Sequence, residues 1–335
     1  MKTLVTGGGG FIGSHLVEAL LARGTEVRVL DNFATGRREN LVPMLHHVEI
    51  VEGDIQSYER VSTAVRGCDV VLHQAALPSV PRSVQDPLTS NAVNVIGTLN
   101  VLLAARDAGA RRLVMASSSS VYGAAPGLPK IEDMPTLPFS PYAVAKQAGE
   151  SYCRAFAEVY GLETVALRYF NVFGPRQDPL SQYAAVIPNF ITAILEGRSP
   201  QLFGDGEQSR DFTYVENVVQ ANLLAVDATG VSGEAFNVAF GDSITLNAML
   251  DQIRTQLGSN VEAEYLQPRK GDVRQSVADI SKARRLLGYE PAVSFSEGLQ
   301  RTISYFRRLM TPPPRLPGPG VAGSLPKIAP TAGNG

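Results

Sequence analysis

Cysteine and histidine are scarce in this chain, and each scarcity excludes a kind of site. Two cysteines, Cys68 and Cys153, are too few for a disulfide framework, and the four histidines show no metal-ligand spacing, so we predict no metal site. A formal charge of −2 gives no basic field that would suggest nucleic acid or a membrane surface as a partner. No uninterrupted apolar run reaches the ~18 residues of a membrane span. The sequence opens on a first strand with no signal peptide ahead of it, so we expect a cytoplasmic protein.

Apolar runs with strand character alternate with helical periodicity in the first half of the chain. Residues 14–23 have the spacing of an amphipathic helix between two such runs. The strand-like runs are residues 2–5, residues 26–30, HHVEIVEGDI, DVVLHQAA and RRLVMASSSSVYG. This alternation predicts an α/β fold with a doubly wound parallel sheet, whose sites lie at the carboxyl ends of its strands.

The chain divides by composition into three parts. We predict a Rossmann domain over residues 1–170, to which later segments return, and a smaller α/β domain over 171–310 that mainly binds substrate. Residues 311–335 are dominated by Pro, Gly, Ala and Ser, and such a segment buries too little apolar surface to fold. We therefore expect a disordered tail.

Three glycines, Gly7, Gly10 and Gly13, lie between the first strand and the first helix. In this spacing Gly7 permits a tight turn, Gly10 the approach of a pyrophosphate, and Gly13 close packing of helix on strand. The helix N-terminus adds free N–H groups and a positive dipole end. A glycine-rich turn alone is often only a turn, but its place between strand and helix predicts a dinucleotide site.

The ends of the next strands carry residues that suit the rest of a dinucleotide. Asp31 ends the second strand, where a carboxylate binds both ribose hydroxyls of the adenosine and repels the 2′-phosphate of NADP. NAD is therefore the predicted cofactor. Asp54 and Ile55 end the third strand and are placed to meet the adenine, whereas Ala75 and Ala76 are small enough for the cofactor to lie against the backbone.

Tyr142 and Lys146 stand four residues apart on a predicted helix over residues 143–160. An ammonium near a phenol favours the ionised phenol, so we predict that Lys146 lowers the pKa of Tyr142 from its reference near ~10. Such a phenol serves as a general base or acid near neutral pH. By itself the spacing also fits a surface tyrosine with a solvated lysine, and the other motifs decide between the two.

Taken together, the motifs resemble the extended short-chain dehydrogenase/reductase family. They are TGGGGFIG, Asp31, GDI, HQAA, NVIGT, SSSSVYG, SPYAVAK, LRYFNVFGPRQ and RDFTYVEN. Within that family they resemble the NAD-dependent UDP-sugar 4-epimerases, over residues 1 to about 310. The resemblance implies a bound NAD, a nucleotide-sugar substrate and a catalytic Ser/Thr–Tyr–Lys set.

Carried onto this chain, the resemblance makes Tyr142 the acid/base and Lys146 its pKa tuner and a ligand of the nicotinamide ribose. Ser118 matches the hydroxyl partner, and its neighbours Ser117 and Ser119 could share that role. The other cofactor contacts that it implies are Phe11, Ile12, Asn32 and Asn94.

Two serines, Ser119 and Ser120, argue against some of the reactions that the resemblance allows. Relatives that dehydrate or decarboxylate the sugar carry Asp or Glu one or two residues after the catalytic hydroxyl, whereas this chain has Ser119 and Ser120. Neither serine can act as a carboxyl acid or base at neutral pH. The resemblance then implies C4 epimerisation, in which hydride passes to NAD and returns to the other face of the rotated ketose.

A small residue in the C-terminal part points to the sugar. Where epimerases restricted to plain hexoses carry a bulky Tyr, this chain has Ser276, which leaves room for a 2-acetamido group. We expect UDP-GlcNAc/UDP-GalNAc and also UDP-Glc/UDP-Gal as substrates, although Pro78 replaces a Lys that some hexose epimerases place near the sugar. The predicted substrate contacts are Ser118, Ser119, Tyr142, Asn171, Arg210, Arg269, Asp272 and Ser276.

Several alternatives stay open at this point. A UDP-glucuronate 4-epimerase would use the same catalytic set, a reductase would consume added NADH, a dehydratase would belong to the same family, and a non-catalytic NAD-binding module would not need that set. The helices predicted over 91–108 and 142–160 carry surplus apolar residues, which predict a homodimer but are equally consistent with core packing.

Overall fold

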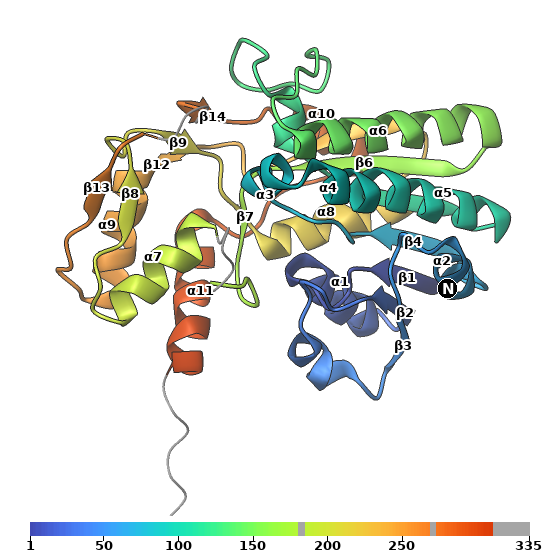
Figure 1. Ribbon diagram of the computed structural model, residues 1–335, viewed down its shortest axis with the longest axis horizontal. Coiled ribbons are helices and arrows are strands. Elements are labelled where there is room, and N and C mark those ends of the chain that lie inside the picture. The colour runs from blue at the N-terminus through green and yellow to red at the C-terminus, as the bar shows by residue number, and fades with distance from the viewer. Residues whose placement is uncertain (180–184, 269–272, 311–335) are drawn as a thin grey trace, which may run out of the picture.

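The computed structural model describes residues 1–179, 185–268 and 273–310. A seven-stranded sheet in the order β11-β6-β5-β4-β1-β2-β3 forms the larger region, and every pairing in it is parallel (Figure 1). Its strands are β1 (Lys2–Thr6), β2 (Glu26–Asp31), β3 (Val48–Glu52), β4 (Val70–His73), β5 (Arg112–Ser118), β6 (Glu163–Tyr169) and β11 (Glu234–Val238). The predicted doubly wound α/β class is confirmed.

The central strands are apolar on both faces because helices cover both faces. On β1, Leu4 belongs to one hydrophobic cluster and Val5 to the other, and both side chains are fully buried. The helices of one face are α1 (Phe11–Ala22), α8 (Val215–Asp227) and α10 (Ser281–Leu287). Those of the other face are α2 (Tyr58–Val65), α5 (Gly97–Asp107) and α6 (Pro141–Tyr160).

One described helix, Pro87–Asp107, is long and apolar enough to cross a membrane by length and composition. It comprises α4 (Pro87–Asn91), the π turn η2 (Ala92–Ile96) and α5, and it follows α3 (Val80–Gln85). Val101 and Leu102 are buried in the cluster beneath α5, so this part of its apolar surface belongs to the core.

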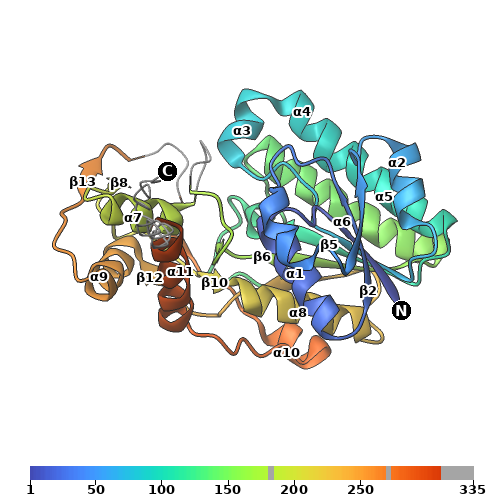
Figure 2. The same cartoon turned by 90° about the horizontal axis from the view of Figure 1, so that it is seen from below.

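A smaller region packs beside the large sheet (Figures 1 and 2). Its helices α7 (Val186–Leu195), α9 (Leu246–Leu257) and α11 (Phe295–Met310) enclose a separate hydrophobic cluster. Its short strands form three small sheets, β10-β7, β12-β9-β14 and β13-β8. They are β7 (Val172–Phe173), β8 (Gln201–Phe203), β9 (Ser209–Arg210), β10 (Thr213–Tyr214), β12 (Ile244–Thr245), β13 (Glu264–Leu266) and β14 (Gln275–Ser276).

Two predicted strands are shorter than expected. Asp54 and Ile55 lie beyond β3, because the Asp54 carboxylate accepts the N–H of Gln56 (2.8 Å) in a side-chain turn that ends the strand. Ala75 and Ala76 lie beyond β4, where the Ala75 N–H donates to Thr6 Oγ1 (3.2 Å). The first helix begins at Phe11, three residues earlier than predicted. The predicted tail lies outside the described residues.

Candidate active site

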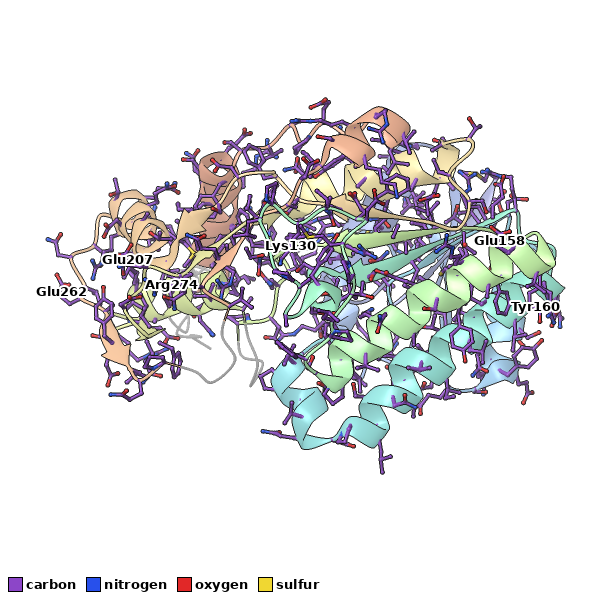
Figure 3. All side chains as sticks on the ribbon, turned by 90° about the horizontal axis from the view of Figure 1, so that it is seen from above. Lys130, Glu158, Tyr160, Glu207, Glu262 and Arg274 are labelled. Carbon is purple, nitrogen blue, oxygen red and sulfur yellow. The ribbon has the colours of Figure 1, made fainter. Side chains whose placement is uncertain are left out.

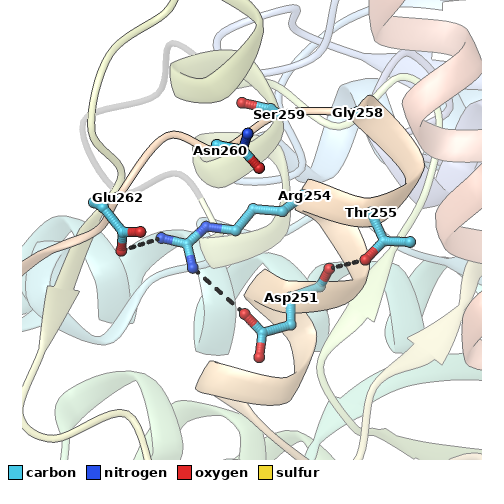
Figure 4. A pocket seen from close by; sticks show the side chains of 7 residues that line it. All are labelled: Asp251, Arg254, Thr255, Gly258, Ser259, Asn260 and Glu262. Atoms are coloured by element: carbon cyan, nitrogen blue, oxygen red, sulfur yellow. Dashed lines mark hydrogen bonds and ion pairs between the residues drawn. The ribbon is translucent and has the colours of Figure 1, made fainter.

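A cavity of about 1580 Å³ opens at the carboxyl ends of the sheet strands, where the two regions meet. Lys130, one of its lining residues, lies at this junction (Figure 3). A second, smaller pocket lies at the end of α9 (Figure 4). Arg254 there pairs with Asp251 and Glu262 and also donates to the Val261 carbonyl oxygen, so we assign that pocket a structural role.

Tyr142 and Lys146 project into the large cavity from the start of α6. This helix begins where the hydroxyl of Ser140 accepts the N–H of Ala143 (3.2 Å), with Pro141 in its first turn. The Tyr142 N–H donates to the Ser83 hydroxyl (3.0 Å) and ties this turn to α3. The Nζ of Lys146 lies 5.8 Å from the centroid of the Tyr142 ring.

The electrostatics of this pair differ from the prediction. Burial raises the pKa of Tyr142, and a hydrogen bond with Ser118 offsets only part of the rise. The predicted lowering by Lys146 is wrong for this structure, because its ammonium donates to the carbonyl oxygen of Ala116 (2.8 Å). Burial also lowers the pKa of Lys146 to about 8, against the opposing effect of the Glu150 carboxylate.

The serine cluster at the end of β5 is divided between two environments. The hydroxyl oxygen of Ser118, beside Tyr142, accepts both the N–H (3.2 Å) and the hydroxyl (2.9 Å) of Ser120. Ser117 donates instead to the Glu150 carboxylate (2.5 Å). Ser119 lines the cavity. Of the serines in this cluster, only Ser118 therefore has a described hydrogen bond with the Tyr142 side chain.

A buried polar network behind this cluster was missed from the sequence. Arg168 on β6 makes a two-pronged ion pair with Glu150 on α6 (2.9 and 2.8 Å) and donates to the hydroxyl of Tyr122 (2.9 Å). Tyr122 in turn donates to Asn237 on β11 (2.6 Å). Glu150 follows Lys146 by four residues on the same helix, and that spacing was the available signal.

The glycine turn after β1 has no room for side chains. Gly7 has φ +70°, and a Cβ there would lie 2.7 Å from the backbone nitrogen of Ala75. A Cβ on Gly13 would lie 2.1 Å from the Gly7 carbonyl oxygen. The N-cap of α1, Gly10, makes no side-chain cap, and no acidic residue occupies the first turn. This turn therefore fits a diphosphate held by N–H groups.

Asp31 is fixed at the edge of the same turn. Its carboxylate accepts the N–H of Gly9 and the N–H of Phe33, both at 2.8 Å. Burial raises its pKa, and these two bonds oppose the rise. The structure thus presents a held carboxylate at the end of β2, where the sequence predicts a contact with ribose.

The structure gathers all but one of the predicted cofactor residues on this cavity. Those that line it are Gly7, Gly10, Phe11, Ile12, Gly13, Asp31, Asn32, Asp54, Ile55, Ala75, Ala76 and Lys146. Asn94 is the exception, because its buried amide accepts the N–H of Leu77 (2.8 Å) and donates to the Leu77 carbonyl (3.1 Å). It holds the loop that lines the cavity.

The other wall of the cavity is built by the smaller region. Asn171 (φ +32°), Arg210 and Ser276 line it, and Arg210 pairs with Ser276 in the parallel register of β9 and β14. The amide of Asn171 donates to the Asp211 carbonyl oxygen (3.0 Å). Arg269 and Asp272 lie outside the described residues.

Asp211 holds three segments of this wall together and was also missed. Its carboxylate accepts the N–H groups of Phe240 (3.0 Å), Gly241 (3.1 Å) and Ala278 (3.2 Å). Burial raises its pKa to about 7, and the three N–H groups act in the opposite direction. The carboxylate thus sets the spacing between β9 and the segment that follows Ser276.

The sequence pattern of the NAD dependent epimerase/dehydratase family matches residues 3–239. The chain belongs to this family. It is 42% identical to the UDP-glucose 4-epimerase of Mycolicibacterium smegmatis over 311 residues, which cover 92% of this chain and 99% of the relative. The family's extended short-chain dehydrogenase/reductase fold, expected from the motifs, is confirmed.

Solved structures of this family agree with the fold. The UDP-N-acetylglucosamine 4-epimerase of Methanobrevibacter ruminantium M1, solved with UDP-N-acetylmuramic acid, superposes with a TM-score of 0.88 at 43% identity, covering 92% of this chain and 99% of that one. The UDP-glucose 4-epimerase of Thermotoga maritima, solved with UDP-glucose, superposes with a TM-score of 0.89 at 39% identity, covering 93% and 100%.

Proposed function

We propose that this protein is an NAD-dependent UDP-sugar 4-epimerase. The observation that carries the proposal is the Ser118–Tyr142 hydrogen bond beside Lys146, in a cavity where positions 119 and 120 are hydroxyls and not carboxyls. This set can move a proton on and off a sugar hydroxyl. It offers no carboxylic acid at the two positions that dehydrating and decarboxylating relatives use.

Tyr142 takes the proton of the 4-hydroxyl and later returns it, while Ser118 holds the phenol by its hydrogen bond. Bound NAD supplies the redox chemistry by accepting hydride from C4 and giving it back, so no external cofactor is consumed. Lys146, with a pKa of about 8, carries its proton at neutral pH, and its ammonium, held by the Ala116 carbonyl oxygen, is proposed to donate to the nicotinamide ribose.

We propose the remaining cofactor contacts from the residues on the cofactor side of the cavity. The turn with Gly7, Gly10 and Gly13 holds the diphosphate, and Asp31 takes the adenosine ribose hydroxyls and excludes NADP. Asp54 and Ile55, which line the same cavity, would contact the adenine.

The substrate is a UDP-sugar held by the smaller region. Arg210 suits a diphosphate because its planar fork engages two oxygens, and Asn171 lies on the same wall. Ser276 leaves space for a 2-acetamido group, so UDP-GlcNAc and UDP-Glc are both proposed substrates. Arg269 and Asp272 remain predicted contacts.

A homodimer and a cytoplasmic location complete the proposal, together with the division into domains at about residue 170. Support for the dimer comes from exposed apolar side chains on α4, η2 and α6, including Leu88 (82% exposed), Ile96 (47%) and Val144 (51%). Support for a reducing compartment comes from Cys68 and Cys153, which are both free and buried.

Incubation of the purified protein with UDP-GlcNAc or UDP-Glc, each without added NAD, tests the proposal by chromatography of the products. Formation of UDP-GalNAc and UDP-Gal is expected, because the redox cycle closes within each turnover. Conversion of UDP-Glc alone would remove the argument from Ser276. Conversion of neither, with turnover of UDP-glucuronate or oxidation of added NADH, would replace the proposed function by a uronic-acid epimerase or a reductase.

A further inference from the structure

Arg176 has a backbone conformation that is unusual for its residue type. Its φ is +66°, in the left-handed region that side chains other than glycine rarely adopt. The three other described non-glycine residues with positive φ are Phe33, Ser79 and Asn171. Phe33 follows Asp31, and the other two line the large cavity. Such strain persists where the surrounding structure requires it, commonly at functional sites.

The segment that carries Arg176 lies along the first turns of α1. The carbonyl oxygen of Pro175 is 3.0 Å from Nε2 of His15, and Nη2 of Arg176 donates to the carboxylate of Glu18 (2.6 Å). A Cβ on Gly174 would lie 3.5 Å from the ring of Phe11. The chain is therefore held against the helix that begins at the glycine turn.

The guanidinium of Arg176 is only partly satisfied by these contacts. Among the residues that the structure describes, its Nη1 is buried and meets no hydrogen-bond partner. Arg176 lines the same cavity as Gly10 and Phe11, at the uncapped start of α1. A buried charged donor without a partner is costly, and an anionic group of a bound ligand would remove that cost.

We infer that Arg176 is a cofactor-binding residue whose guanidinium donates to the diphosphate of the bound dinucleotide, beside the N–H groups at the start of α1. This inference rests on the dinucleotide cofactor of the family and not on the epimerisation step. Arginine suits the task because its fixed fork can hold Glu18 with one nitrogen and a phosphate oxygen with the other.

The competing explanation is that Arg176 serves only its ion pair with Glu18. That pair is a weak reason for a strained backbone, because the Glu18 side chain is 57% exposed and exposed ion pairs contribute little. Glu18 therefore supplies a matched control, since its replacement removes the ion pair and leaves the guanidinium in place.

The test measures binding of NAD, ADP-ribose and adenosine to the full-length protein freed of NAD, by calorimetry, for wild type, Arg176→Gln and Glu18→Gln. We expect Arg176→Gln to weaken NAD and ADP-ribose by roughly tenfold to one-hundredfold, the range for a hydrogen bond to a charged group, and to leave adenosine unchanged. Glu18→Gln should change all three by less than about threefold.

Equal losses in the two variants would overturn the inference, because the ion pair alone would then explain Arg176. An equal loss for adenosine and ADP-ribose would also overturn it, since adenosine has no phosphate. If Arg176→Gln fails to fold, Arg176→Lys keeps the charge but not the fork, and a loss for ADP-ribose that is absent for adenosine is still required. None of these outcomes depends on sugar turnover, so the proposed function can fail while this inference stands.

Discussion

The two walls of the large cavity are built in different ways. The cofactor wall follows from one parallel sheet with strands of four to seven residues, and its central strands β1, β4 and β5 are buried along most of their length. The substrate wall is carried by strands of two residues, β9 and β14, which are about 65 residues apart in sequence. The glycine turn and Asp31 of the first wall lie within one strand–turn–helix–strand unit, whereas Arg210 and Ser276 of the second come together only through the pairing of β9 with β14.

The two walls also differ in whether their side chains can be replaced without changing the shape of the wall. At the glycine turn, backbone atoms lie within 3 Å of where a side chain would begin, so that wall cannot vary without losing its shape. On the substrate wall, Ser276 faces a cavity and is anchored by backbone pairing, which allows its side chain to vary. A family can thus keep one cofactor and change its sugars.

The largest effect is expected where the two walls meet, at Tyr142. Replacement by Phe removes the group that moves the proton and should lower kcat by about 10²–10⁴-fold, the usual contribution of general acid–base catalysis. NAD content, measured by absorbance after release, should be unchanged because the ring and its packing remain. Activity close to wild type would show that Tyr142 is not the base.

Gly13→Ala tests whether the glycine turn of the cofactor wall can accept a side chain. Its Cβ would lie 2.1 Å from the Gly7 carbonyl oxygen, so the turn must shift, and NAD affinity should fall by about tenfold to one-hundredfold. Gly24→Ala is the control, because Gly24 has φ +71° but open space around it. That variant should lose about 1 kcal/mol of stability and keep NAD affinity. Tight NAD binding by Gly13→Ala would show that the cofactor wall does accept a side chain, and the proposed difference between the two walls would be wrong.

Ser276→Tyr tests the tolerance of the substrate wall. The larger side chain fills space that we assign to the acetamido group, so kcat/KM for UDP-GlcNAc should fall by about tenfold or more relative to UDP-Glc. NAD affinity should not change. An equal loss for both sugars would mean that the substitution damages the wall and does not select between them.

The smallest effect concerns the pH profile. The pKa of Lys146 is lowered to about 8 by burial, so activity that needs its ammonium should fall as pH rises past 8. Glu150→Gln removes the charge that favours the ammonium and should move this fall in activity to lower pH by about one unit. The substitution also breaks the buried ion pair with Arg168, so activity is compared at a temperature where both proteins are folded. Ser117→Ala removes only the hydrogen bond to Glu150 and should leave the pH at which activity falls unchanged.

Unfolding of the protein would not produce this fall in activity above pH 8. The folded state lowers the pKa of Lys146 below its ordinary value of 10.5, so the unfolded chain binds more protons between about pH 8 and 10.5. The contribution of this lysine to stability therefore rises with pH in that window. A melting experiment across the same pH range separates the two effects.

The sequence predicts the cofactor wall well because the motifs that form it each span only a few consecutive residues. The glycine spacing and the acid at the end of β2 are decided within one strand–turn–helix unit, and the structure places them together. The pKa of Tyr142 could not be predicted, because the carbonyl of Ala116 that takes the Lys146 ammonium lies on another element. Asp211 gave no signal either, since its partners follow it by 29, 30 and 67 residues.

The last strand of the large sheet has a consequence for the order of synthesis. β11 pairs with β6 at the edge of the sheet, with Glu234 beside Val165, yet it is translated after the start of the smaller region. Until it emerges from the ribosome, β6 has an unpaired edge, which is a site for wrong association. A fragment that stops at residue 170 would keep this edge permanently and would also lack α8, which packs against α1. Exchange of the smaller region between relatives therefore needs cuts on both sides of β11.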